Sequence, residues 1–402
     1  MSSRDVIQVE DTFGANAYAK RPLVLAKGSG ATVWDLEGRE YIDCTGSYGS
    51  CLVGYCHPKI AHAISEQATT LSSCHGYAYN PVRAELMSKL VRIAPRSLTK
   101  VFLSNSGTES VECALKVARR YAGKKEIIAM VGGFHGKTLG ALSATWNMKY
   151  REPFQPLVPG FRHVPYGSLE KAEEAVTPDT AAIIVEPIQG ESGVKVPPEG
   201  YLKGLRELCD RRNILLIIDE VQTGFGRTGK MFACEHWDVA PDILCCAKGA
   251  AGGLPIGITL AREDVMTRLG RGEHSSTYGG NPIIAAAAST AIDIIVEEKL
   301  PQKAAELGSH LLGKLKGAQA EYKIIREARG RGLMIGVEFR FDILGIINGC
   351  MSRGVLVLDA GRTVMRLLPP LAITSEQLDR AYDVIVNVVE EKERTSVPRP
   401  PP

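Results

Sequence analysis

Short apolar runs that alternate with amphipathic stretches restrict the fold of this chain more than any other feature. Four of the runs have the length of a β-strand and are rich in Ile, Leu or Val: residues 126–130, 181–185, 214–218 and 243–246. Continuous apolar character indicates strands that are buried on both faces. The stretches between the runs, such as 109–122 and 201–212, have helical periodicity. The pattern predicts an α/β fold with a mostly parallel sheet.

The pattern changes after residue 298. A helical stretch near 301–316 precedes strand-like segments at 332–339, 355–358 and 364–367, and a final helix is expected from Ser375. This arrangement predicts a smaller α+β domain over residues 299–390, beside a large domain over residues 51–298.

The two ends of the chain are expected to behave differently from the domains. Residues 1–50 contain short strand-like runs near 23–26 and 32–34, too few to fold alone. They are expected to pack on the small domain or on a partner subunit. The Pro-rich end, residues 391–402, is predicted to be a disordered tail.

Composition excludes several classes of protein. The 402 residues are 45% hydrophobic and 23% charged, as in ordinary globular proteins. A formal net charge of +3 gives no broad basic face for nucleic acid, and no apolar run is long enough to cross a membrane. The charged N-terminus is unlike a signal peptide. Ten scattered cysteines without a CxxC pair predict free buried thiols, no metal site and a cytoplasmic location.

A segment of small polar residues precedes one of the predicted helices. Residues 104–110 read Ser-Asn-Ser-Gly-Thr-Glu-Ser. At a helix start, such residues leave unpaired N–H groups that point outward, with the positive end of the helix dipole behind them. This arrangement binds phosphate. An ordinary N-cap by Ser106 or Thr108 is the alternative interpretation.

Two further residues follow predicted strands. Asp219 ends the run 214–218, so its carboxylate is expected at the carboxyl edge of the sheet, where α/β proteins bind ligands. A buried carboxylate there needs a cationic partner, such as a protonated ring nitrogen, although an N-capping role would also explain it. Lys248 follows the run 243–246. A lysine among small buried residues can become a nucleophilic amine, whereas most lysines after strands reach solvent.

The order of these three features along the chain matches the groups of pyridoxal phosphate. The polar loop would hold the phosphate, Asp219 would keep the ring nitrogen protonated, and Lys248 would hold the aldehyde. The sequence therefore predicts a pyridoxal 5'-phosphate site with Lys248 and Asp219 as catalytic residues.

From about Pro22 to Val389 the chain resembles the class III (subgroup II) aminotransferases. The resemblance is carried by Asn105-Ser106-Gly107-Thr108-Glu109, Gly133-Phe134-His135-Gly136, Glu186-Pro187-Ile188-Gln189-Gly190-Glu191, Ile218-Asp219-Glu220-Val221-Gln222-Thr223-Gly224, Lys248, and Thr277-Tyr278-Gly279-Gly280-Asn281-Pro282. It implies fold type I of the pyridoxal-phosphate transferases, with a seven-stranded, mostly parallel sheet in the large domain and a smaller α+β domain. It also implies a homodimer.

The resemblance implies a set of cofactor-binding residues. They are Ser106, Gly107, Thr108, Phe134, Asp219, Gln222, Lys248 and Thr277. Phe134 would stack on the pyridine ring, and Gln222 would touch the ring oxygen. Thr277 would reach the phosphate of the neighbouring subunit. His135 is expected to support the site from behind.

Glu191 and Arg366 resemble the gate pair of this family. Arg366 would hold the α-carboxylate of glutamate at two points, because a guanidinium fork matches a carboxylate. Glu191 would neutralise Arg366 when the second substrate presents its distal amine. Glutamate and 2-oxoglutarate are therefore the expected amino donor and its product.

Residues 41–49 and 143–154 resemble one branch of the family, which acts on lysine or ornithine joined to the small acidic carrier protein LysW. The resemblance predicts an amino-acid semialdehyde as acceptor and a role in lysine or arginine biosynthesis. An acidic carrier would need a basic rim at the site. Candidates for it are Lys149, Arg151, Arg268 and Arg271, although scattered surface charge is the alternative interpretation of these residues.

One position departs from the family. Most of that branch, and the acetylornithine enzymes, have arginine after Phe-x-Gly, where this chain has Lys137. Lysine offers a point charge instead of a planar fork, so a substrate carboxylate would be held less firmly there.

Three alternatives remain open. The close one is an acetylornithine or ornithine aminotransferase that acts on free substrates. An aminomutase or racemase on the same scaffold would have no need for two alternating substrates, and the gate pair argues against it. A non-catalytic binding protein would have no need for Lys248.

Overall fold

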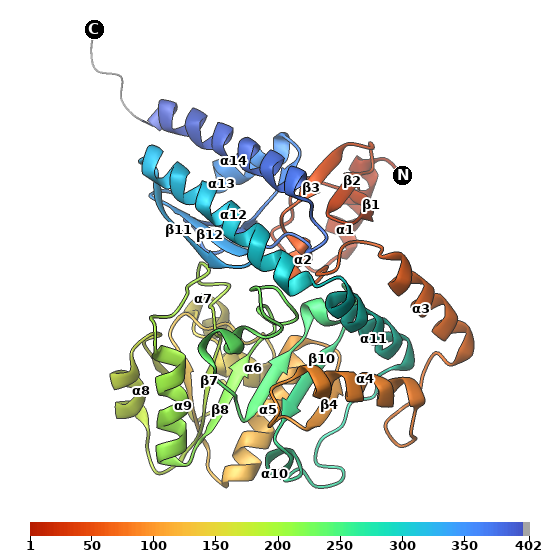
Figure 1. Cartoon of the computed structure of the whole chain (residues 1–402), viewed down its shortest axis with the longest axis vertical. Helices are drawn as coiled ribbons and strands as arrows, with labels where there is room; N and C mark the ends of the chain where they lie inside the picture. The colour runs from red at the N-terminus through yellow and green to blue at the C-terminus, as the bar shows by residue number, and fades with distance from the viewer. Residues whose placement is uncertain (397–402) are drawn as a thin grey trace.

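A seven-stranded sheet forms the centre of the larger unit (Figure 1). The structure is a computed structural model that describes residues 1–396. In spatial order the strands are β4 (Lys100–Ser104), β10 (Gly257–Ala261), β9 (Ile243–Cys246), β8 (Leu215–Asp219), β7 (Thr180–Val185), β5 (Glu126–Met130) and β6 (Phe161–Val164). Of these seven, β10 alone runs antiparallel to its neighbours. The carboxyl ends of the other six strands therefore meet at one edge.

The predicted apolar runs form the middle of this sheet. The runs 126–130 and 243–246 are β5 and β9. The run 181–185 lacks the first residue of β7, and the run 214–218 is displaced by one residue from β8. Every residue of β7, β8 and β9 is buried. Each large apolar side chain buried in this way contributes about 1.5–3 kcal/mol to stability.

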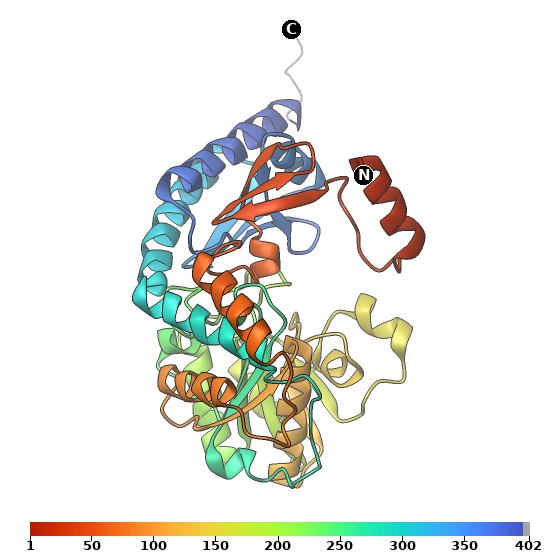
Figure 2. The same ribbon diagram turned by 90° about the vertical axis from the view of Figure 1, so that its right-hand side faces the viewer.

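Helices cover both faces of the sheet (Figures 1 and 2). Successive strand residues point to opposite faces, so Ile217 joins the apolar core beneath Val111 of α5, whereas Ile218 joins the core that contains Leu205 of α9. The helices of this unit are α3 (Pro58–Thr70), α4 (Pro81–Ile93), α5 (Gly107–Ala122), α6 (Leu139–Ala144), α7 (Met148–Arg151), α8 (Leu169–Ala175), α9 (Tyr201–Arg212), α10 (Glu263–Met266) and α11 (Pro282–Glu297). Short 3-10 turns are η1 (Glu152–Phe154), η2 (Ala233–Trp237) and η3 (Lys248–Ala251).

The smaller unit is built on a four-stranded antiparallel sheet. In spatial order its strands are β11 (Ile325–Arg331), β12 (Met334–Phe339), β15 (Val364–Leu367) and β14 (Leu358–Asp359). Three helices pack on it: α12 (Leu300–Glu321), α13 (Leu344–Ser352) and α14 (Ser375–Ser396). This is the α+β arrangement expected after residue 298.

The last helix is longer than predicted. It begins at Ser375 as expected but continues through Ser396, so the prediction of a disordered tail is wrong for residues 391–396. Charged residues hold the extra turn: Arg394 pairs with Glu390 one turn earlier, and Glu391 pairs with Arg353. The rest of the predicted tail, residues 397–402, lies outside the described residues.

The first fifty residues pair with the C-terminal part of the chain. Strands β1 (Leu25–Ser29), β2 (Thr32–Asp35), β3 (Glu40–Asp43) and β13 (Val355–Leu356) form a sheet, in which Ile42 lies opposite Val355. The short α2 (Gly46–Gly49) follows. Helix α1 (Ser3–Phe13), which was not predicted, stands apart from the body in Figure 2 and has no buried residue. The domain boundaries at 50, 298 and 390 stay a prediction.

The ten cysteines are all free, and eight of them are buried. Cys56 is exposed and Cys74 is half-buried. Across residues 1–396, every helix is too short or too polar to cross a membrane.

Candidate active site

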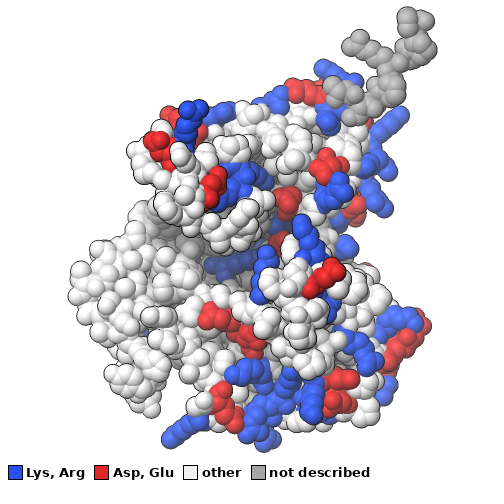
Figure 3. Space-filling model, turned by 180° about the vertical axis from the view of Figure 1, so that it is seen from behind, with Lys and Arg blue, Asp and Glu red and all other residues white. Residues whose placement is uncertain are grey.

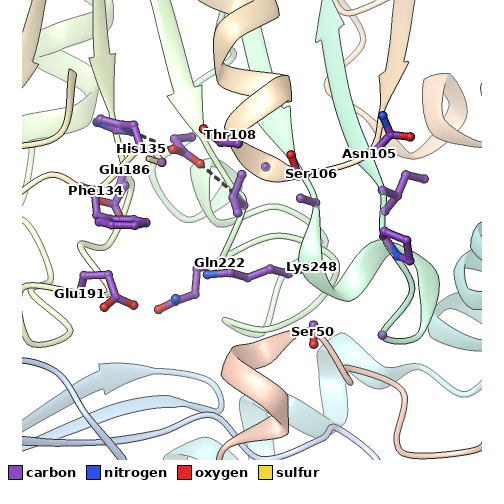
Figure 4. Close-up of a pocket in the computed structure, with 18 of the residues that line it drawn as sticks. Ser50, Asn105, Ser106, Thr108, Phe134, His135, Glu186, Glu191, Gln222 and Lys248 are labelled. Atoms are coloured by element: carbon purple, nitrogen blue, oxygen red, sulfur yellow. Dashed lines mark hydrogen bonds and ion pairs between the residues drawn. The ribbon is translucent and has the colours of Figure 1, made fainter. Parts of the chain in front are cut away.

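A cavity of about 440 Å³ opens at the carboxyl edge of the large sheet (Figure 4). The segments that follow β4, β8 and β9 meet there because these strands run in the same direction. Most of the predicted site residues line this cavity: Ser106, Gly107, Thr108, Phe134, Glu191, Asp219, Gln222 and Lys248.

The N-terminus of α5 faces the cavity. Ser106 is its N-cap, and the hydroxyl accepts the N–H of Glu109 at 3.4 Å, so the capping interpretation also describes this residue. Thr108, in the first turn, shares a hydrogen bond of 2.8 Å with Thr138. A side chain at Gly136 would run into Thr108, so glycine there lets the 133–136 loop lie against the helix start. The N–H groups and dipole of this 16-residue helix suit a phosphate.

Asp219 is buried at the end of β8, and its two oxygens have different partners. One oxygen accepts the N–H of Val221 at 3.0 Å. The other lies 2.7 Å from Nδ1 of His135. Burial alone would lower the pKa of His135, but the hydrogen bond and the charge of Asp219 outweigh burial and raise it. These contacts fix the direction of the carboxylate, and His135 supports it from behind as predicted.

Lys248 follows β9 in an uncommon backbone conformation, with φ of 40°. In Figure 4 its side chain extends across the cavity toward Gln222 and Glu191. Burial is the main cause that lowers the pKa of the amine. Glu191 opposes this effect and Arg366 adds to it, and the resulting pKa is below the ordinary value for lysine. A lowered pKa favours the neutral amine, which is the form that attacks a carbonyl.

Phe134 forms one side wall of the cavity (Figure 4). Its N–H donates to Glu186 at 2.9 Å, and the second oxygen of Glu186 accepts the N–H of Gly190 at 3.2 Å. The carboxylate therefore ties the Phe134 loop to the loop that carries Glu191. Burial raises the pKa of Glu186 to about 7. A side chain at Gly190 would run into the Gln222 amide, so glycine there leaves room for Gln222.

The gate pair is in contact, although its members lie 175 residues apart in the chain. Arg366, completely buried on β15, donates through Nη1 to Glu191 at 2.6 Å and to Gln222 at 3.1 Å. Burial would raise the pKa of Glu191, but the charges of Arg366 and Lys248 outweigh burial and lower it. Among the described residues Arg366 Nε has no hydrogen-bond partner. That nitrogen is fully buried and does not face the cavity in this arrangement.

A second cavity of about 710 Å³ adjoins the first and shares Phe134, Glu191 and Lys248 with it. Lys137 lies in its wall, with Nζ 4.7 Å from the ring centre of Tyr150, a cation–π contact. We call this second cavity the outer cavity and the first one the inner cavity.

Sequence reasoning missed two tyrosines of the outer cavity, Tyr18 and Tyr48. The Tyr48 ring lies 5.8 Å from the Arg366 guanidinium, and its backbone is left-handed with φ of 56°. Tyr18 follows α1 and is largely exposed. No periodicity or motif marks Tyr18. Tyr48 lies in the stretch 41–49 that resembles one branch of the family, but the resemblance assigned it no role. The packing of the N-terminal segment brings both residues to the site. The glycines on both sides of Ser47-Tyr48 are the one local signal of an unusual turn.

Two predicted residues lie elsewhere. Thr277 is exposed and lines neither cavity of its own chain. Arg268 packs over Tyr121, at the end of α5 opposite to Gly107 and roughly 20 Å along the helix axis. The candidate Arg268 therefore lies away from both cavities, as the interpretation of scattered surface charge expects, whereas Lys149 does line the outer cavity.

The residues of the inner cavity fit pyridoxal phosphate. A helix N-terminus and hydroxyls suit the phosphate, a fixed carboxylate suits the ring nitrogen, an aromatic wall suits the ring, and a buried amine of lowered pKa suits the aldehyde. These groups converge on one cavity of the size that small ligands occupy.

Comparison with known proteins agrees with this chemistry. Residues 13–389 match the family model described as aminotransferase class-III. The acetylornithine aminotransferase of Methanopyrus kandleri is 49% identical over 95% of this chain and 97% of that protein. Ornithine aminotransferase 1 of Staphylococcus aureus is 43% identical over 93% and 96%. The ornithine aminotransferase of Toxoplasma gondii, whose structure contains pyridoxal phosphate at partial occupancy, superposes with a TM-score of 0.95 at 36% identity, covering 98% of this chain and 96% of that one.

The predicted family, fold type, cofactor and enzyme class are thereby confirmed, in place of an isomerase or a non-catalytic protein. The chain belongs to the class III aminotransferases and is a pyridoxal-phosphate-dependent transaminase.

Proposed function

We propose that this enzyme moves the terminal amino group of N-acetylornithine or ornithine to 2-oxoglutarate, forming glutamate. The observation that carries the proposal is the 2.6 Å contact of Glu191 with buried Arg366 beside Lys248. Arg366 can bind the carboxylate of an acidic substrate, or it can be neutralised by Glu191 when a substrate presents its distal amine. Two different substrates can therefore alternate in one site.

The inner cavity would hold the cofactor through the residues named above. Ser106, Gly107 and Thr108 would bind its phosphate, Phe134 and Gln222 would position the ring, and Asp219 would keep the ring nitrogen charged. When bound, the cofactor supplies a carbonyl that takes up the amino group and a ring that withdraws electrons. Lys248, whose pKa is lowered mainly by burial, would carry the proton to and from the substrate carbon.

The outer cavity would recognise the part of the substrate that does not react. Lys137 would bind the carboxylate of ornithine or its acetyl derivative, with Tyr150 fixing the ammonium in place. Replacing Lys137 with Arg is expected to lower the KM for N-acetylornithine several-fold, because a planar fork binds a carboxylate at two points.

Three of the relatives described by comparison bear the names acetylornithine or ornithine aminotransferase, which favours free substrates over a carrier-linked one. The second candidate function is amino transfer to a substrate that is linked to LysW, with a role in lysine biosynthesis. The cationic side chains Lys137, Lys149 and Arg362 in the outer cavity support it.

We also propose a homodimer in the cytoplasm, with Thr277 completing the phosphate site of the partner. Four large side chains are exposed on two neighbouring segments: Leu71, Tyr77, Tyr79 and Tyr278. The Asn281 amide joins the two segments by a hydrogen bond to the carbonyl of Ser72. Exposed apolar surface of this kind favours association. In Figure 3 a broad area at the lower left of the molecule, seen from behind, is almost free of charged side chains.

The test is to measure kcat/KM for free N-acetylornithine, free ornithine and carrier-linked ornithine and lysine, each with 2-oxoglutarate. The highest value for a free substrate supports the proposal. A hundredfold preference for a carrier-linked substrate would replace it with the second candidate. Absence of amino exchange with glutamate would reject both.

A further inference from the structure

The loop that carries Glu191 is held in a strained conformation. After Glu191 the chain passes through Gly193 with φ of 101° and Val194 with φ of 53°. A left-handed conformation is rare for a β-branched residue and persists only where its surroundings impose it. Val194 is completely buried in a small apolar cluster with Ile188, Met334, Leu358 and Leu368. Both units of the molecule contribute to that cluster.

Arg329 of β11, in the smaller unit, forms hydrogen bonds to this loop. Its Nε and Nη2 both donate to the carbonyl of Gly193, at 2.9 and 2.6 Å. Its Nη1 donates to Glu327 and Glu338, both at 2.7 Å. The Arg329 side chain is 12% exposed, so water competes little with these bonds. On the side of the larger unit, the Ser192 hydroxyl donates to the carbonyl of Gly132.

The same small sheet holds the other member of the gate pair. Glu338, which anchors Arg329, lies on β12, and β12 pairs with β15 so that Gly336 stands opposite Arg366. A side chain at Gly336 would press on Val194 and on the carbonyl of Gly193, so strand and loop are in close contact. Arg366 is thus fixed to this sheet directly, and Glu191 is fixed to it through Arg329.

We propose that Arg329 is a positioning residue that holds Glu191 against Arg366 and thereby sets the balance between the two substrates. The proposal rests on the function proposed above. A loop released from Arg329 leaves Glu191 free to move away, so the carboxylate of glutamate competes better for Arg366. The amine substrate, which depends on the neutralised pair, reacts less well.

The experiment compares the holoenzyme with Arg329→Gln and with a matched control, Arg326→Gln. Arg326 lies on the same strand and pairs with the same Glu338, at 3.1 Å, but its side chain is exposed. Its backbone carbonyl accepts a hydrogen bond from the side-chain amide of Gln319. Stopped-flow absorbance of the cofactor gives kcat/KM for each half-reaction, with glutamate and with N-acetylornithine or ornithine. We expect Arg329→Gln to shift the ratio about tenfold toward glutamate, the effect of losing a charge-assisted hydrogen bond, and Arg326→Gln to leave the ratio unchanged.

A double-mutant cycle tests whether the effect passes through Glu191. In a Glu191→Gln background, Arg329→Gln is expected to add no further change in the ratio. Equal slowing of both half-reactions, the same shift from Arg326→Gln, or a full further shift in the Glu191→Gln background would overturn the inference. Arg329→Lys keeps the charge for Glu327 and Glu338 but reaches Gly193 with fewer donors, and it is expected to give a smaller shift. A wild-type enzyme without a glutamate half-reaction would instead reject the proposed function.

Discussion

At the scale of single residues, Asp219 is the group whose surroundings can be tested most directly. Both of its oxygens are engaged, by His135 and by the N–H of Val221. The carboxylate therefore acts on two neighbours: on the imidazole behind it, and on the ring nitrogen that would lie in front of it.

Replacing Asp219 with Asn should change both neighbours. The pKa of His135 should fall, since the hydrogen bond and charge of Asp219 are what raise it against burial. Turnover with glutamate should fall about 10²–10³-fold, because a fixed charge facing the reacting system is lost. NMR titration of His135 and steady-state kinetics measure the two effects, and an unchanged pKa of His135 would contradict the argument.

The Lys248 amine lies between a carboxylate and a guanidinium that act on its pKa in opposite directions. Glu191→Gln should lower this pKa further, and Arg366→Met should raise it. The pH dependence of pyridoxal phosphate uptake by the cofactor-free protein reports the fraction of neutral amine. Its profile should move to lower pH in the first variant and to higher pH in the second. A shift of both profiles in the same direction would indicate a change of conformation instead.

At the scale of elements, the start of α5 depends on how closely the 133–136 loop approaches it. Gly136 has φ of 133°, and a Cβ there would meet the Thr108 hydroxyl. Glycine is therefore required for two reasons, the backbone conformation and the space.

Gly136→Ala should displace Thr108 and weaken cofactor binding at least about tenfold, or about 1.4 kcal/mol. Gly123→Ala is the matched control, since Gly123 ends the same helix with φ of 65° and has open space around it. The control should lose about 1–2 kcal/mol of stability to backbone strain and keep its cofactor affinity. Equilibrium dialysis and thermal unfolding separate the two results; equal affinities in the two variants would exclude steric displacement.

Elements that consist of continuous apolar residues were predictable, because a strand buried on both faces has one pattern of side chains. This pattern predicted the strands β5, β7, β8 and β9. It also predicted the positions of Asp219 and Lys248, which lie at the end of β8 and just after β9.

Helix α1, the turn at Tyr48 and the last turn of α14 were not predicted. The turn at Tyr48 depends on a contact between distant segments, Tyr48 with Arg366, which no local pattern encodes. Helix α1 does carry a local signal, the capping box of Ser2 with Asp5, and the last turn of α14 carries the pair of Glu390 with Arg394.

At the scale of the whole molecule, the position of Thr277 bears on how many chains make one site. It is exposed and lines neither cavity of its own chain. If it completes the partner's phosphate site, each site needs Lys248 from one chain and Thr277 from the other.

Mixed dimers distinguish this arrangement from a self-contained site. Thr277→Glu should abolish activity, because a negative charge would face the phosphate, and Lys248→Ala should abolish it independently. A dimer with one chain of each kind should regain one intact site and about half of the wild-type activity, since the Thr277→Glu chain receives its threonine from the Lys248→Ala chain. Mixed dimers without activity would show that Thr277 does not act across an interface.

The buried cysteines can report local unfolding, because each thiol becomes accessible only when the structure around it opens. Burial raises the pKa of the Cys51, Cys113 and Cys350 thiols to about 12, so they stay protonated and slow to react until their surroundings open. A brief pulse of a neutral alkylating reagent should modify Cys56 and Cys74 at once and the other eight only as elements unfold locally. The order in which Cys350 of α13 and Cys245 of β9 gain the label would reveal which unit opens first, and whether the cofactor delays it.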